Sequence, residues 1–184
     1  MRDIHGIEEV NDRLRPHWPK IQEHFDAENE RFKALMAGEH DALGRVLKCH
    51  LIVEHYMDQF LEQHFHLEHL AEAKLTFFQK ATLLPTRGTT AAVVKPGILK
   101  LNWVRNQYGH NLAVEIDQNK MRVIDDLLAI MRPDTVFESL ADRIEAFTTV
   151  ACVCLLEAPP GIARRFQEAF ADFHSETIKT DSDD

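Results

Sequence analysis

One short stretch of the chain holds side chains that could together act on a phosphodiester: Arg105, Asn106 and His110. Near neutral pH a histidine can take a proton from a hydroxyl group or return one to a leaving oxygen. An arginine is always charged and can bind two oxygens at once, so Arg105 can stabilise the charge that gathers on a phosphorane. Asn106 is polar but unreactive, and we expect it to orient His110 or the substrate. These residue types predict cleavage of an RNA phosphodiester without a metal ion or any other cofactor.

The spacing of Arg105 and His110 allows the two side chains to meet only if the helix between them is interrupted. On an uninterrupted helix the two side chains would point about 140° apart, because successive residues turn by about 100°. Gly109 lies between them, and glycine favours the left-handed conformation that ends many helices. We therefore expect the helix to end at Gly109 and His110 to turn back towards Arg105. Since the reaction benefits from both an acid and a base, we also expect a homodimer that brings a second His110 to the same cleft.

The charge pattern singles out the same part of the chain. Residues 73–114 contain no Asp or Glu but six basic residues: Lys74, Lys80, Arg87, Lys95, Lys100 and Arg105. The chain as a whole has a net charge of −9, which disfavours a protein that coats nucleic acid through its overall field. The acid-free window predicts either a local RNA-binding surface, with Lys95, Lys100 and Arg87 contacting phosphates, or a basic face that packs on the acidic remainder of the molecule.

An arginine and a polar residue followed by a histidine, here Arg105, Asn106 and His110, resemble the active-site motif of the HEPN superfamily. The resemblance covers residues 41–111, from the helix that begins at Asp41 to the motif itself. It implies a helical and often dimeric ribonuclease, of the kind that includes toxins encoded beside a nucleotidyltransferase antitoxin. In such toxins a tyrosine often stands two residues after the histidine, but Leu112 occupies that position here. The mannitol-repressor-like branch is similar in layout, so a regulatory protein that binds without cutting is the alternative.

Three further residues could support the site. Glu54 falls within an otherwise apolar arc of the helix expected over residues 41–65, and a buried carboxylate needs a partner. That partner is either a structural group or Arg105, in a pairing that resembles the role of acidic residues in several HEPN proteins. Asn111 could orient His110. Tyr108 could stack on a nucleotide, although aromatic residues at helical spacing more often lie in a core.

The sequence holds no pattern typical of metal ligands. His64, His66 and His69 lie close to Glu68, but no helical His-Glu-x-x-His zinc motif is present. We expect these histidines to mark a solvated helix boundary, and we expect no metal in the protein. The three cysteines lie in apolar runs, which suits a reduced compartment.

Helical periodicity runs through nearly the whole sequence, and no segment alternates like a strand. We expect an all-α, single-domain, HEPN-like bundle of about six to seven helices over residues 1–174, followed by an acidic, disordered tail over 175–184. Helices are expected over residues 20–37, 41–65, 67–84, 96–109, 117–131 and 133–156, with a last one that ends near residue 173. Without an apolar leader or a membrane-spanning stretch, the protein is expected to be cytoplasmic and to bind no membrane.

Overall fold

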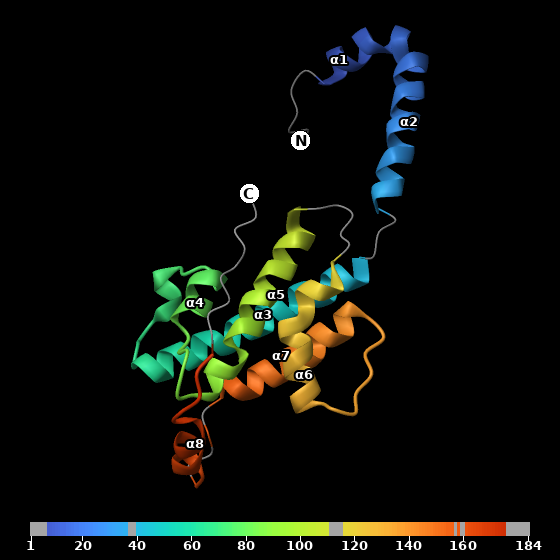
Figure 1. Cartoon of the computed structure of the whole chain (residues 1–184). Coiled ribbons are helices and arrows are strands. Elements are labelled where there is room, and N and C mark those ends of the chain that lie inside the picture. The colour runs from blue at the N-terminus through green and yellow to red at the C-terminus, as the bar shows by residue number, and fades with distance from the viewer. Residues whose placement is uncertain (1–6, 37–39, 111–115, 157, 159–160, 176–184) are drawn as a thin grey trace. The chain divides into compact units, whose positions relative to one another are not determined.

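The computed structural model is an all-α helical bundle, as the periodicity predicts (Figure 1). It describes residues 7–36, 40–110, 116–156, 158 and 161–175, and within these ranges the only β feature is an isolated bridge between Arg87 and His174. The α-helices are α1 (Ile7–Leu14), α2 (Trp18–Met36), α3 (His40–Phe65), α4 (Phe77–Leu83), α5 (Thr90–His110), α6 (Arg122–Met131), α7 (Leu140–Leu155) and α8 (Ala163–Phe170). The short 3₁₀ helices are η1 (Arg15–His17), η2 (Leu70–Ala73) and η3 (Gln118–Met121).

Residues 1–38 and 39–184 form two compact units. The first unit contains α1, η1 and α2, and none of its described side chains is buried. Its large apolar side chains Trp18, Phe25 and Phe32 are exposed. The second unit supplies every buried residue of the described chain.

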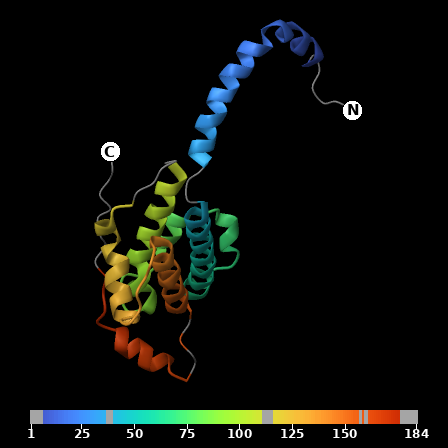
Figure 2. The ribbon, with the colours of Figure 1, turned by 90° about the vertical axis from the view of Figure 1, so that its right-hand side faces the viewer.

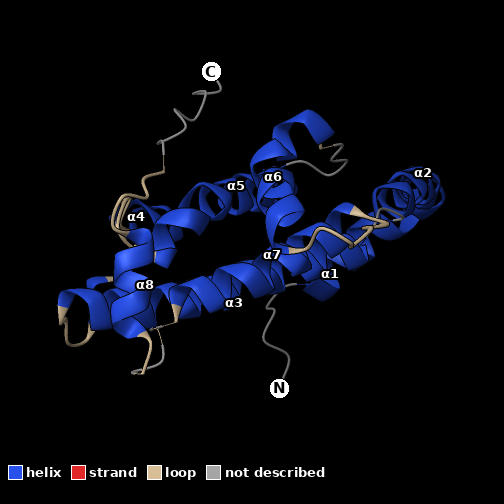
Figure 3. Ribbon diagram, turned by 60° about the horizontal axis from the view of Figure 1, so that its bottom comes forward, coloured by secondary structure: helices blue, strands red, loops and turns tan. Residues whose placement is uncertain are grey.

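The core of the bundle lies between three long helices. α3 packs along α7, and α5 packs against both (Figures 2 and 3). α6 lies against α5 and α7, and α4 lies against α3 and α5. Met57 of α3, Ile98 and Leu101 of α5, and Phe147 of α7 are fully buried in this core. Because α5 buries apolar side chains against several neighbours, its position in the bundle is firmly set.

α5 begins earlier than the sequence suggests. It starts at Thr90 and passes through Pro96 and Gly97, where we expected a helix to start. Gly97 faces the ring of Phe147, and a Cβ atom at position 97 would lie only 2.4 Å from Phe147 Cε2, so glycine is needed for this close approach of α5 to α7. Ala91, in the first turn, is fully buried. Packing therefore maintains the helix on both sides of the proline, although Pro96 removes one backbone hydrogen bond.

The prediction of a single helix over residues 67–84 is wrong. His66, His69 and Lys74 adopt left-handed backbone conformations with φ angles of 52°, 62° and 50°. These residues interrupt the helix, so the chain forms η2 and then a separate α4. Thr76 and Gln79 form a capping box at the start of α4, which satisfies backbone groups that the interruption leaves free.

α7 also begins later than expected. Its capping box is formed by Ser139 and Asp142. The Ser139 hydroxyl accepts from the Asp142 backbone N–H at 3.1 Å, and an Asp142 oxygen accepts from the Ser139 backbone N–H at 3.0 Å. The helix therefore starts at Leu140, where both halves of the box are present.

α8 and the segment after it lie at the Thr90 end of α5 (Figure 1). α8 ends at Phe170, and the chain then pairs briefly with the segment before α5. The N–H of Gly88 donates to the Phe173 carbonyl at 3.0 Å, and the N–H of Ser175 donates to the Thr86 carbonyl at 2.8 Å. The expected acidic tail lies, apart from its first residue, outside the described residues. None of the described helices is both long and apolar enough to cross a membrane.

Candidate functional site

The candidate site lies at the C-terminal end of α5. Arg105, Asn106 and His110 all belong to this one uninterrupted helix. Our expectation that Gly109 ends the helix is wrong, because helical geometry continues through His110. Glycine permits the left-handed conformation but does not require it. Asn106 and His110 are four residues apart and share a face, whereas Arg105 begins about 100° round the helix from Asn106.

The side chain of Arg105 bends towards Asn106 and the last turn of the helix. Its Nη1 donates to Oδ1 of Asn106 at 3.2 Å. The same nitrogen lies against Gly109, since a Cβ atom built on that glycine would be 3.7 Å from it. His110, the next residue, is exposed. A Cβ atom at position 109 would make only an ordinary contact with the guanidinium, so this position does not require glycine. The Arg105 side chain reaches the last turn through its own length, without a break in the helix.

A buried histidine from α3 lies near this arginine. His50 is 8% exposed, its ring stacks on Phe77 with centroids 3.8 Å apart, and its Nε2 lies 3.3 Å from Oδ1 of Asn102. Burial lowers the pKa of His50, and the positive charge of Arg105 acts in the same direction. The hydrogen bond to Asn102 and the negative charge of Glu54 raise this pKa and so oppose the effect of burial. This setting suits a neutral imidazole whose Nε2–H donates to the amide oxygen. Asn102 was not among the predicted residues. Its position three residues before Arg105 on the same helix could have indicated that it lies close to the candidate site.

Glu54 does not pair with Arg105. Its Oε1 lies 2.9 Å from Nζ of Lys80, which also lies 2.8 Å from Oδ1 of Asp58. The Lys80 side chain is only 9% exposed, so these groups form a largely buried ion cluster between α3 and α4. Of the two partners considered for Glu54, a structural group and Arg105, the structure shows a structural group, the ammonium of Lys80. Two acidic residues four positions apart on one helix were the signal for a shared cation.

The electrostatic setting of Arg105 differs from that of Arg45 on α3. Nε and Nη2 of Arg45 each donate to Glu145 at 2.8 Å, and Nη2 also donates to Asp142 at 2.5 Å. Arg105 has no carboxylate partner within the described residues, and its one hydrogen bond there is to the amide of Asn106. The guanidinium of Arg105 therefore retains donors that an anion could accept from.

Lys95 is not available to bind RNA. Its side chain is buried, and its Nζ donates to the carbonyls of Leu84 at 2.6 Å and Thr82 at 2.8 Å. The ammonium thus satisfies carbonyls at the C-terminal end of α4, and its burial lowers the pKa of Lys95. The prediction that Lys95 contacts phosphates is wrong, since its charge is used inside the bundle.

The other two predicted RNA-binding residues lie at different ends of α5. Arg87 is exposed but precedes the first turn of this 21-residue helix, so roughly 30 Å of helix separates it from His110. Lys100 is half-buried, with Nζ 4.6 Å from the centroid of the Trp103 ring. Lys120 of η3 lies 5.2 Å from the same centroid. Lys120 was not among the predicted residues, because it lies outside the acid-free window.

The remaining predicted residues are less informative. Asn111 lies outside the described residues. Tyr108 is half-buried and packs against the core. His64 stacks on Phe60, with ring centroids 5.1 Å apart. Over the described ranges, no group of three or more His, Cys, Asp or Glu side chains is arranged to hold a metal ion.

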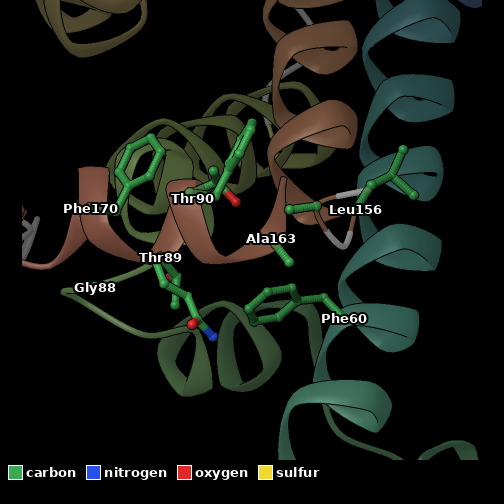
Figure 4. Close-up of a pocket in the computed structure, with 10 residues that line it drawn as sticks. Phe60, Gly88, Thr89, Thr90, Leu156, Ala163 and Phe170 are labelled. Carbon is green, nitrogen blue, oxygen red and sulfur yellow. The ribbon is translucent and has the colours of Figure 1, made fainter. Parts of the chain in front are cut away.

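A cavity of about 360 Å³ lies at the Thr90 end of α5 (Figure 4). Phe60 from α3, the first residues of α5 and the aromatic side chains of α8 surround it. Its lining residues are all uncharged: Phe60, Gly88, Thr89, Thr90, Leu156, Ala158, Ala163, Phe166, Gln167 and Phe170. None of them is a predicted site residue, so this cavity is separate from the candidate site.

No protein-family model, curated protein or solved structure matches this chain.

Proposed function

We propose that the protein is a metal-independent endoribonuclease of the HEPN type whose active site is the C-terminal end of α5. The observation that carries the proposal is the position of Arg105. Its guanidinium lies against Gly109 and bonds to Asn106, one turn before the exposed His110. It has no carboxylate partner in the described part of the chain, so it offers a permanent positive charge close to a histidine. This pairing suits a phosphate whose ester bond breaks with proton transfer.

The proposed reaction is an internal transfer at phosphorus. His110 takes the proton of a ribose 2′-hydroxyl, and the 2′-oxygen forms a bond to the adjacent phosphorus. The bond from phosphorus to the 5′-oxygen breaks, and that oxygen accepts a proton. The products are a 2′,3′-cyclic phosphate and a 5′-hydroxyl, and no water is consumed. Arg105 binds the non-bridging oxygens, whose negative charge rises as the phosphorane forms.

A second copy of the chain completes this proposal. One imidazole cannot be base and acid in the same step, so a symmetric homodimer would supply the other proton-transfer group. Leu51 on α3 is 65% exposed, and Leu47 one turn earlier is 36% exposed, which gives an apolar surface that a second copy could cover. We expect Leu51→Asp to shift the protein from dimer to monomer in sedimentation and to lower cleavage. If Leu51→Asp remains dimeric, the dimer interface does not include this surface of α3.

Cleavage in the presence of a chelator tests the proposed function. Purified protein is incubated with labelled tRNA and mRNA in excess EDTA, beside the variants His110→Ala and His55→Ala. His55 is an exposed histidine on α3 and serves as the matched control. We expect His110→Ala to lower the rate by at least about 100-fold, because that is the usual contribution of general acid–base catalysis, and His55→Ala to leave it unchanged. Absence of cleavage by the wild-type dimer would favour the non-cutting regulatory protein.

A further inference from the structure

Trp103 of α5 has two ammonium groups close to its ring. Nζ of Lys100 lies 4.6 Å from the ring centroid, and Nζ of Lys120 lies 5.2 Å from it. Lys100 comes from the preceding turn of α5 and Lys120 from η3, so the cluster joins two separate segments. The face of an indole attracts cations, which offsets part of the repulsion between two like charges. The ring therefore gathers two cations within reach of one RNA strand.

The positive charge of this cluster is open to a ligand on the side of Lys120. Lys120 is exposed, and within the described residues it forms no ion pair with an acidic side chain. Asp117, three residues earlier, uses its Oδ1 to accept from the backbone N–H of Asn119 at 2.9 Å and from the Asn119 amide at 3.1 Å. Trp103 is half-buried and packs against the core. The ring is thus anchored, while the lysine can turn towards an anion.

The cluster shares a helix face with the candidate active site. Trp103 and His110 are seven residues apart on α5, which places them about 10.5 Å apart along the axis and only about 20° apart around it. Asn106, to which Arg105 donates, lies between them. With about 3.4 Å per stacked nucleotide, a single strand covers this distance in about three nucleotides.

We infer that Lys100, Trp103 and Lys120 form a phosphate-binding subsite for single-stranded RNA, on the face of α5 that carries His110. The inference depends on the proposed function. It adds a position for the part of the RNA strand that extends beyond the cleaved bond. The phosphate binds the ammonium of Lys120 and draws it away from the ring. Because a phosphate contact reads no base, this subsite contributes affinity and register but no sequence preference.

The test measures binding apart from cleavage. The chain has two tryptophans, so in the double variant Trp18→Phe, His110→Ala the emission of Trp103 alone reports on the ring. This protein is titrated with octauridylate at several salt concentrations, with and without Lys120→Ala. Lys48→Ala, which removes an exposed lysine of α3, is the matched control. Thermal melting followed by circular dichroism confirms that each variant is folded.

We expect octauridylate to change the emission of Trp103. Each lost phosphate contact should make the plot of log affinity against log salt shallower by about 0.7, so Lys120→Ala changes the slope by about that amount and the double variant Lys100→Ala, Lys120→Ala by about 1.4. Lys48→Ala should leave the slope unchanged. Equal slopes for Lys120→Ala and its parent, or an unchanged Trp103 emission at saturation, would overturn the inference.

The subsite and the proposed function fail in different ways. If Lys120→Ala with His110 intact cleaves and binds RNA as well as the wild type, the subsite is wrong and the ribonuclease stands. If the wild type does not cleave but the two lysines still set the salt dependence, the subsite stands as an RNA-binding surface and the ribonuclease is wrong. Absence of both binding and cleavage overturns both.

Discussion

The basic residues of the acid-free window fall into two groups that differ in burial and in their partners. Lys80 and Lys95 are buried, and each gives its ammonium to partners inside the bundle: Lys80 to carboxylates of α3 and Lys95 to carbonyls at the end of α4. Lys100 and Arg105, further along the chain, are half-buried and lie near the end of α5. One run of positive charge in the sequence therefore serves two purposes. Its first part stabilises the fold, and in its second part Arg105 retains guanidinium donors that a substrate could accept from.

A second comparison concerns the two arginines that the structure places in contrasting settings. Arg45 is held by two carboxylates of α7, whereas Arg105 bonds only to an amide among the described residues. A guanidinium that already binds carboxylates has few N–H donors left for a phosphate. We therefore expect Arg45 to stabilise the contact between α3 and α7 and Arg105 to act on substrate.

The largest expected effect separates these two arginines. Arg105→Ala should lower the rate of RNA cleavage by about 100-fold to 1000-fold, because a donor that stabilises transition-state charge is lost. Its unfolding free energy should change by less than about 0.5 kcal/mol, as for most substitutions away from buried networks. Arg45→Ala should leave cleavage unchanged. Single-turnover rates and urea unfolding of both variants check this, and an equal loss of activity in the two would contradict the distinction.

Lys80 should give the largest effect on stability. Lys80→Met leaves Glu54 and Asp58 without their shared cation, and breaking a buried pair typically costs about 3–5 kcal/mol. We expect about 3 kcal/mol, at the lower end, because the two carboxylates are 26% and 31% exposed and keep some water. Urea unfolding measures this loss. An unfolding free energy within experimental error of the wild type would show that the cluster is not a structural one.

A smaller loss of stability is expected at Lys95. Lys95→Met retains the apolar stem but leaves the carbonyls of Thr82 and Leu84 without their donor. An unsatisfied buried acceptor costs about 1–3 kcal/mol. RNA affinity measured by filter binding should stay unchanged, since the ammonium does not reach the surface. A loss of affinity without a loss of stability would return Lys95 to the RNA-binding residues.

The smallest expected effect is a change in pH dependence at Arg45. Hydrogen bonds from Arg45 lower the pKa of Asp142 below 3.8 and that of Glu145 below 4.5. The unfolded chain therefore binds these protons more readily, so this stabilisation is present above about pH 4.5 and is lost as the pH falls through the lowered values. In Arg45→Met the unfolding free energy should fall less steeply from about pH 5 to pH 3. An equally steep fall would assign the acid sensitivity to other groups.

The all-α class and the helix that carries the site could be predicted because helical periodicity is a local property. Ile98, Leu101 and Val104 repeat at helical spacing, and all three are fully buried. The ends of helices were harder to predict. Pro96 and Gly97 indicate a start when considered alone, but the ring of Phe147, far along the chain, holds α5 together across them.

The sequence indicates which residue types could form the candidate site, but it does not indicate their partners. Arg105 and Asn106 do contact one another, through a side chain that bends along the helix rather than through a break at Gly109. The partner of Glu54 depends on how α4 packs on α3, which no local pattern specifies. Lys120 of η3 lies over the ring of Trp103 of α5, a contact between separate segments that no local pattern specifies.

The most direct test of the central claim is the chemical nature of the ends that the wild-type protein leaves on RNA in excess EDTA. The proposed roles of His110 and Arg105 predict a 2′,3′-cyclic phosphate on one fragment and a 5′-hydroxyl on the other, and neither product with His110→Ala or Arg105→Ala. Fragments with 3′-hydroxyl and 5′-phosphate ends, or the same fragments from the His110→Ala protein, would contradict the assignment of this chemistry to the end of α5.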